Sequence, residues 1–200
     1  MASTEHSNRG STLLSIARAA IATALGDTMQ TAEDAVWLQA CGACFVTLTQ
    51  HGQLRGCVGT LEARRSLLDD VKANALAAAL RDSRFAPLSA AELTHTRIEL
   101  SLLSPLQALH FDSEAHALAQ LQPGIDGVVL EFEHYRSTFL PQVWEQLPTA
   151  CEFIAQLKYK AGLPRDFWAQ GVRLQRYSVS KWKEADLLHR IAAAAESGES

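Results

Sequence analysis

The chain has 200 residues, of which 48% are hydrophobic and 20% are charged, and its formal net charge is -4. This balance is typical of one good-sized globular domain, and it excludes collagen-like and wholly disordered chains. The negative net charge also excludes a general attraction to nucleic acid or to anionic membranes, so any anion site has to be local.

The first ten residues are polar and lack the basic flank and apolar core of an export signal, so we expect residues 1–10 to be a tail and the protein to be cytoplasmic. No apolar run approaches the roughly 20 residues that cross a bilayer. The cysteines are too few for a disulfide framework in a chain of this length, which predicts free thiols. They are Cys41, Cys44, Cys57 and Cys151.

A helix and a hairpin are predicted in the N-terminal part of the chain. Apolar residues recur with helical spacing after Ser11, which would cap the helix, and Gly26 would end it. Residues 44–49 and 54–59 are rich in strand formers. Residues 51–52 between them, His-Gly, suit a tight hairpin turn.

Two capped segments and a strand follow the hairpin. Ser66 and Asp69 have the spacing of a capping box at the start of a second helix, and Ser89 and Glu92 repeat that spacing. Residues 97–103 alternate polar with apolar side chains, as a half-buried strand does.

The second half of the chain predicts a short helix over 113–121, a hairpin within 127–140 and a long helix over 149–162. The apolar phase changes within 172–180, which predicts a strand with a bulge, and residues 184–200 are expected to form a C-terminal helix and frayed tail. Helices interspersed with hairpins indicate the α+β class with mainly antiparallel pairing.

The first hairpin carries the side chains that most strongly indicate a functional site. With residues 51–52 as the turn, Cys57 would lie opposite Val46 and Arg55 opposite Leu48, which would place Arg55 and Cys57 on one face. A guanidinium beside a thiol favours the thiolate, the nucleophilic form. The alternative interpretation is that Cys57 is a small core residue and Arg55 an edge charge.

Two glycines flank this pair. Gly56 and Gly59 would leave the backbone uncovered, so that a ligand can approach it closely. The combination predicts a site for an anionic or electrophilic ligand, and we expect Arg55 to bind that ligand directly through its planar fork.

The stretch Leu54-Arg55-Gly56-Cys57-Val58-Gly59 resembles the signature of the AMMECR domain family, which includes bacterial members called AmmeMemoRadiSam system protein A. The similarity runs from about Leu13 to Tyr177, and the order and spacing of its motifs make it specific. The other matching stretches are Phe45 to Leu48, Asn74-Ala75, Asp82 to Phe85 with Pro87, Ser101 to Leu103, Gly124 to Gly127, Thr138 to Trp144, and Lys160 to Leu163.

The resemblance implies an intracellular α+β protein over residues 11–183, with two unequal lobes and the Arg-Gly-Cys hairpin facing a cleft between them. Bacterial members resemble one part of a three-component system, beside a radical SAM protein and a Memo-like protein, which implies modification of a substrate by a reaction not established for the family. Cys57 is then the candidate nucleophile. The alternative is a non-catalytic binding or adaptor module for a protein or nucleic-acid partner.

Four further residues are candidates for the same site. Asp82 and Arg84 form either a structural ion pair at the helix exit or an anion clamp. Asn74, on an apolar helix face, either fixes a backbone loop or reaches the cleft. Glu92 is accounted for by its capping box.

Cofactors and metals are not expected. Cys41 and Cys44 have the spacing of a redox pair or half a zinc site, but they precede a strand and lack a second paired motif. Phosphate-binding glycine loops and dinucleotide fingerprints do not occur in the sequence. One basic region could receive a phosphorylated substrate, a nucleic acid or an acidic partner, or be a solvated strand face. Its members are Lys158, Lys160, Arg165, Arg173, Arg176, Lys181 and Lys183.

Overall fold

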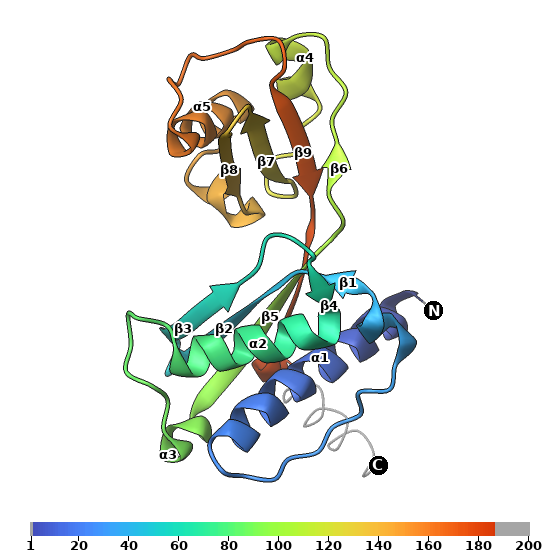
Figure 1. The fold of residues 1–200 in the computed structure, drawn as a ribbon, viewed down its shortest axis with the longest axis vertical. Coiled ribbons are helices and arrows are strands. Elements are labelled where there is room, and N and C mark those ends of the chain that lie inside the picture. The colour runs from blue at the N-terminus through green and yellow to red at the C-terminus, as the bar shows by residue number, and fades with distance from the viewer. Residues whose placement is uncertain (1, 187–200) are drawn as a thin grey trace, which may run out of the picture. The chain divides into compact units, whose positions relative to one another are not determined.

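The computed structural model describes residues 2–186 of the chain. It has the predicted α+β class, with antiparallel sheets and helices (Figure 1). Two compact units share the chain: the first comprises the residues up to Leu103 and those from Ser180 onward, and the second comprises Ser104–Val179. The predicted cleft between lobes stays a prediction.

The first unit is a four-stranded sheet with the strand order β10-β5-β2-β3. Two long helices, α1 and α2, lie side by side on one face of this sheet (Figure 1). A pair of short strands, β1 and β4, and the short helices η1 and α3 complete the unit. The bounds are α1 Ala2–Ala24, η1 Val36–Gln39, β1 Cys41–Gly42, β2 Cys44–Gln50, β3 Gln53–Gly59, β4 Arg65–Ser66, α2 Leu67–Leu80, α3 Ala90–Leu93, β5 Thr96–Leu103 and β10 Val179–Lys183.

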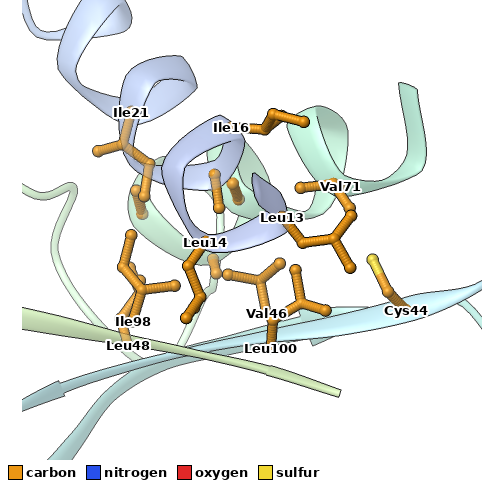
Figure 2. Packing of buried hydrophobic residues seen from close by; sticks show 14 of the residues in the cluster. Leu13, Leu14, Ile16, Ile21, Cys44, Val46, Leu48, Val71, Ile98 and Leu100 are labelled. Carbon is orange, nitrogen blue, oxygen red and sulfur yellow. The ribbon is translucent and has the colours of Figure 1, made fainter. Parts of the chain in front are cut away.

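The core of the first unit lies between these helices and the sheet (Figure 2). Strand β2 alternates as a half-covered strand should, because Cys44, Val46 and Leu48 are fully buried while the residues between them are partly exposed. Burial of these apolar side chains is the main stabilising contribution. The helices and β5 contribute the fully buried side chains of Leu13, Leu14, Ile16, Ile21, Val71, Ile98 and Leu100, among others.

Helix α1 begins earlier than predicted, at Ala2, so the expected polar tail is helical. The predicted cap, Ser11, lies inside the helix, where its hydroxyl donates to the carbonyl of Asn8 at 2.9 Å. Ser11 therefore bonds back into the preceding turn, an alternative open to serine within a helix. The sequence pattern alone does not distinguish this bond from a cap.

The segment that begins at Ser180 belongs to the first unit, and an ion pair links it to α1. Arg18 of α1 donates to both carboxylate oxygens of Glu184, and Glu184 also accepts from the backbone N–H of Ile98. Residues 184–186 are helical, and the rest of the predicted C-terminal helix and tail lies outside the described residues.

The second unit is a four-stranded sheet with the order β6-β9-β7-β8, packed against α4, α5 and η2. Its core centres on Phe153 of α5, whose ring stacks on Trp144 at a centroid distance of 3.9 Å. Helix α5 ends as predicted at Gly162, which has a φ of 92°. The bounds are β6 Gln107–Ala108, α4 Glu114–Ala119, β7 Gly127–Phe132, β8 Tyr135–Phe139, η2 Pro141–Glu145, α5 Ala150–Ala161 and β9 Arg173–Tyr177.

The predicted bulged strand over 172–180 is wrong. The chain instead forms two strands, β9 and β10, which belong to different sheets and are separated at Ser178. The change of apolar phase lies within β9, where Leu174 and Tyr177 are both buried in the second unit although they are three residues apart. The sequence pattern alone does not show where the chain passes from one sheet to the other.

Candidate functional site

The β2–β3 hairpin has the predicted turn but a different register. His51 and Gly52 both have positive φ, 51° and 78°, as a type I′ turn requires. Beyond the turn the pairing shifts by one residue, so that Cys57 lies opposite Thr47 and not opposite the predicted Val46. The shift is a bulge in which Arg55 is the extra residue of β3.

This register places Cys57 on the sheet face opposite α1 and α2, which we call the outer face. Its neighbour there is Thr47, whose hydroxyl donates to the Cys57 Sγ atom at 3.3 Å. Both residues are partly exposed. Cys44 is the contrast, because it lies fully buried on the core face and burial strongly raises the pKa of its thiol. The structure therefore distinguishes an inert core thiol from a thiol that is open to solvent.

Asp82 and Arg84 hold the backbone of Cys57 from outside the sheet. The Asp82 carboxylate accepts from the Cys57 N–H at 2.9 Å, and Arg84 donates to the Cys57 carbonyl at 3.3 Å. The two side chains also form an ion pair at 2.6 Å. Because β3 is an edge strand, its outward N–H and C=O groups need partners, and this pair supplies them at Cys57. The bonds from Arg84 and from the Cys57 N–H hold the pKa of Asp82 well below its usual range.

Arg55 has a protein partner. Its Nε and Nη2 atoms both donate to Glu92 Oε1 at 3.2 Å, and its guanidinium lies 5.9 Å from the centroid of the Phe85 ring. Its Nη1 atom is buried without a hydrogen-bond partner. The bulge removes the simple alternation that predicted a shared face with Cys57, and only 12% of the Arg55 side chain is exposed.

Glu92 joins the predicted capping box to Arg55. Its carboxylate accepts from the backbone and the hydroxyl of Ser89 and from Arg55. These bonds, those from Ser89 first, lower the pKa of Glu92 from 4.5 to about 2. Sequence analysis accounted for the cap and missed the ion pair, because the partner is remote along the chain.

Replacing Glu92 with glutamine should therefore make stability less dependent on pH. A carboxylate whose pKa is lowered by folding stabilises the protein above its unfolded pKa, and that contribution is lost as the pH falls through the folded value, here between 4.5 and about 2. We expect the melting temperature of Glu92→Gln to lie below wild type at pH 7 and to approach it at pH 2. Parallel curves for the two proteins over this range would contradict the assignment.

The two glycines of the motif serve packing within the first unit. A Cβ atom on Gly56 would lie 2.2 Å from the backbone oxygen of Ala78 in α2, and one on Gly59 would lie 2.3 Å from the Phe45 ring. The prediction that these glycines leave room for a ligand is wrong at both positions, because protein atoms fill the space. Close approach of α2 to the edge strand is what requires Gly56.

Asn74 is buried and belongs to a polar network beneath the sheet. Its amide donates to the carbonyl of Cys44 and to Asp70 Oδ2, both at 3.0 Å. Asp70, itself 1% exposed, accepts further bonds from the Cys44 N–H, from Thr60 and from Arg65. Asn74 was predicted either to fix a backbone loop or to reach the cleft. Its contact with the Cys44 carbonyl agrees with the first interpretation. The network holds the start of β2 on α2 and so sets the position of the hairpin.

A family model described as AMMECR1 matches residues 14–182 of this chain. The chain belongs to the AMMECR1 family. Protein MJ0810 of Methanocaldococcus jannaschii is 33% identical over 151 residues, which are 72% of this chain and 73% of that protein. A protein of Methanothermobacter thermautotrophicus is 35% identical over 187 residues, 88% of this chain and 95% of the relative. The crystal structure of an uncharacterized protein, PH0010 from Pyrococcus horikoshii, is similar with a TM-score of 0.72 and 28% identity, covering 88% of this chain and 91% of that one.

The AMMECR1 match spans parts of both units, whereas the predicted site residues all lie in the first. Cys57, Asp82 and Arg84 come together at the edge of β3, and Arg55 lies close by with Glu92. Gly56, Gly59 and Asn74 contact protein atoms around them.

Thr47 and Glu99, which lie on the outer face, were not among the predicted site residues. Thr47 donates to Cys57 and is paired with Glu99 of β5. The alternation of residues 97–103 indicates that Glu99 lies on the polar face of its strand. Only the correct hairpin register places that face of β5 beside Thr47 and Cys57.

The predicted basic region of this AMMECR1 chain is divided between the two units, with Lys181 and Lys183 in the first. Each of its members contacts a partner within the protein, and Lys181 and Lys183 share theirs. The partners are Glu114 for Lys158, the Thr138 carbonyl for Lys160, the Tyr159 ring for Arg165, Glu131 for Arg173, Asp126 for Arg176, and Glu99 for Lys181 and Lys183.

Within residues 2–186, no group of three or more His, Cys, Asp or Glu side chains could hold a metal ion. None of the helices in that range combines the length and the apolar character needed to cross a membrane.

Proposed function

We propose that this AMMECR1 protein is a cytoplasmic component of a multi-part modification system, in which Cys57 acts as a nucleophile toward a small electrophilic substrate. The observation that carries the proposal is the way the thiol is held. The backbone of Cys57 is bonded at both its N–H and its C=O, and its Sγ accepts from Thr47 on a partly exposed face. Such fixation of a nucleophile lowers the entropic cost of reaction.

A hydrogen-bond donor, Thr47, and a cation, Arg84, lie close to the thiol. A hydrogen bond donated to sulfur stabilises the thiolate more than the neutral thiol. The hydrogen bond with Asp82 is the largest cause that raises the pKa of the Arg84 guanidinium. A negative charge on Cys57 adds to this effect, because Arg84 lies near it. In the proposed step the thiol proton passes to solvent and the sulfur lone pair forms a bond to an electrophilic carbon. The displaced electron pair leaves with a departing group or moves onto a carbonyl oxygen.

The partners proposed are a radical SAM protein and a Memo-like protein. The similarity of the Leu54–Gly59 stretch to bacterial members of such systems supports this assignment. A nucleic-acid partner has less support, since most residues of the basic region are paired with carboxylates of the protein itself. Affinity capture with the purified chain, with Cys57→Ala as the comparison, tests the assignment. Capture of neither protein class by wild type would contradict it.

Replacing Cys57 with alanine should abolish function and leave the fold nearly intact. Removing one small, partly exposed side chain should cost at most about 2 kcal/mol of unfolding free energy. The measurement is complementation of a deletion strain by Cys57→Ala, with Cys151→Ala, an exposed cysteine of the other unit, as the control. Full complementation by Cys57→Ala would overturn the nucleophile assignment and favour the non-catalytic binding module.

A further inference from the structure

The outer face continues beyond Cys57 as a row of polar side chains that crosses the whole sheet. Thr47 is paired with Cys57 on one side and with Glu99 of β5 on the other. Glu99 in turn forms ion pairs with Lys181 at 2.6 Å and with Lys183 at 3.5 Å, both from β10. We call these five residues the outer row.

The alternation of β10 confirms which face the two lysines occupy. Trp182 lies between them and packs against the core cluster of the first unit. Because successive side chains of a strand point to opposite faces, Lys181 and Lys183 point to the outer face. Their contact with Glu99, whose neighbours Ile98 and Leu100 are fully buried, agrees with this placement.

The far end of the outer row carries excess positive charge. One carboxylate, Glu99, is shared by two ammonium groups, and its side chain is only 18% exposed. Lys181 and Lys183 remain 48% and 45% exposed, so each has donors available to a further acceptor. Arg97, paired with Thr49 on the same face, adds another exposed cation. This concentration occurs in a chain whose net charge is -4.

The spacing of the row sets the size of a ligand that could use both ends. Neighbouring strands lie about 4.8 Å apart, so β3 and β5 are separated by about 10 Å and β3 and β10 by about 14 Å. Between these ends lies Thr47, and the Phe45 ring lies beside it on the same face, against Gly59. An extended ligand over Thr47 would therefore contact the thiol at one end and the lysines at the other.

We propose that the substrate of the Cys57 site carries an anionic group, a carboxylate or a phosphate, that Lys181 and Lys183 bind about 10 to 14 Å from the reacting carbon. This inference rests on the proposed function, since it takes Cys57 as the reacting group. It assigns specificity to the two lysines. Glu99 holds them toward the row and is a positioning residue.

The test uses two maleimide probes of equal length, 6-maleimidohexanoic acid and its neutral primary amide, with modification at each cysteine followed by peptide mass spectrometry. At Cys57 the acid should react about threefold faster than the amide, as one exposed ion pair allows, and this ratio should fall as salt is added. At Cys151, in the second unit, the ratio should be close to one.

Lysine variants show whether Lys181 and Lys183 cause the faster reaction of the acid at Cys57. Lys181→Gln with Lys183→Gln should bring the ratio at Cys57 to about one, whereas Lys72→Gln, which alters a lysine paired with Glu33, should not change it. If Cys57 reacts readily with the amide but shows no preference for the acid, the inference is overturned and the proposed function stands. A preference that survives in the double variant also overturns it. If neither probe modifies Cys57, both proposals fail.

Discussion

Replacing Gly56 with alanine should destabilise the first unit by about 3 kcal/mol or more, because a Cβ atom there would lie 2.2 Å from the Ala78 backbone oxygen. Ala78 lies in the last turn of α2, and its backbone oxygen cannot rotate away as a side chain can, so α2 and β3 would have to separate. The measurement is urea unfolding followed by tryptophan fluorescence.

Gly52→Asn is the matched control for Gly56→Ala. It also removes a glycine of the hairpin, but at a turn position with φ of 78° and nothing within 4 Å of a Cβ. Asparagine tolerates this conformation, so a change below about 0.5 kcal/mol is expected. If Gly56→Ala were as mild as the control, the space beside Gly56 would be open, as a ligand-binding glycine requires.

Replacing Asp70 with alanine should cost about 3 to 5 kcal/mol of unfolding free energy. Its buried carboxylate accepts from the Cys44 N–H, Thr60, Arg65 and Asn74, and all four donors would lose this acceptor. Denaturant unfolding of the purified variant measures the loss.

Asp69→Ala provides the comparison for Asp70→Ala, since Asp69 is the preceding residue of α2 and its side chain only accepts from Ser66 at the exposed helix start. We expect it to cost less than about 1 kcal/mol. Equal losses for the two variants would show that the network around Asp70 does not hold β2 on α2.

Local patterns in the sequence were sufficient for the elements whose causes are local. The His51-Gly52 turn, the capping box of Ser89 with Glu92, and the end of α5 at Gly162 were all predicted and are present. Each depends on residues within a few positions of one another, where turn and cap chemistry acts.

The register at Cys57 could not be predicted in this way. The bulge residue, Arg55, is held by Glu92 and Phe85, which are remote in sequence, and no local pattern encodes those contacts. A shift of one residue moves each side chain of a strand to the other face. The prediction therefore named Cys57 but misplaced its neighbour, and it could not find Thr47 or Glu99.

The proposed function requires Cys57 to be a reactive thiol held by Thr47, and the rate of iodoacetamide modification at pH 7 measures that reactivity. Each cysteine is followed separately by mass spectrometry in wild type, in Thr47→Val and in Thr49→Val. Thr49 is the control because it lies on the same face of β2 as Thr47 but is paired with Leu54 and not with Cys57. We predict that Cys57 reacts about tenfold faster than exposed Cys151, and that Thr47→Val alone lowers the Cys57 rate severalfold. A Cys57 that reacts no faster than Cys151, or that is indifferent to loss of the Thr47 hydroxyl, would contradict the claim.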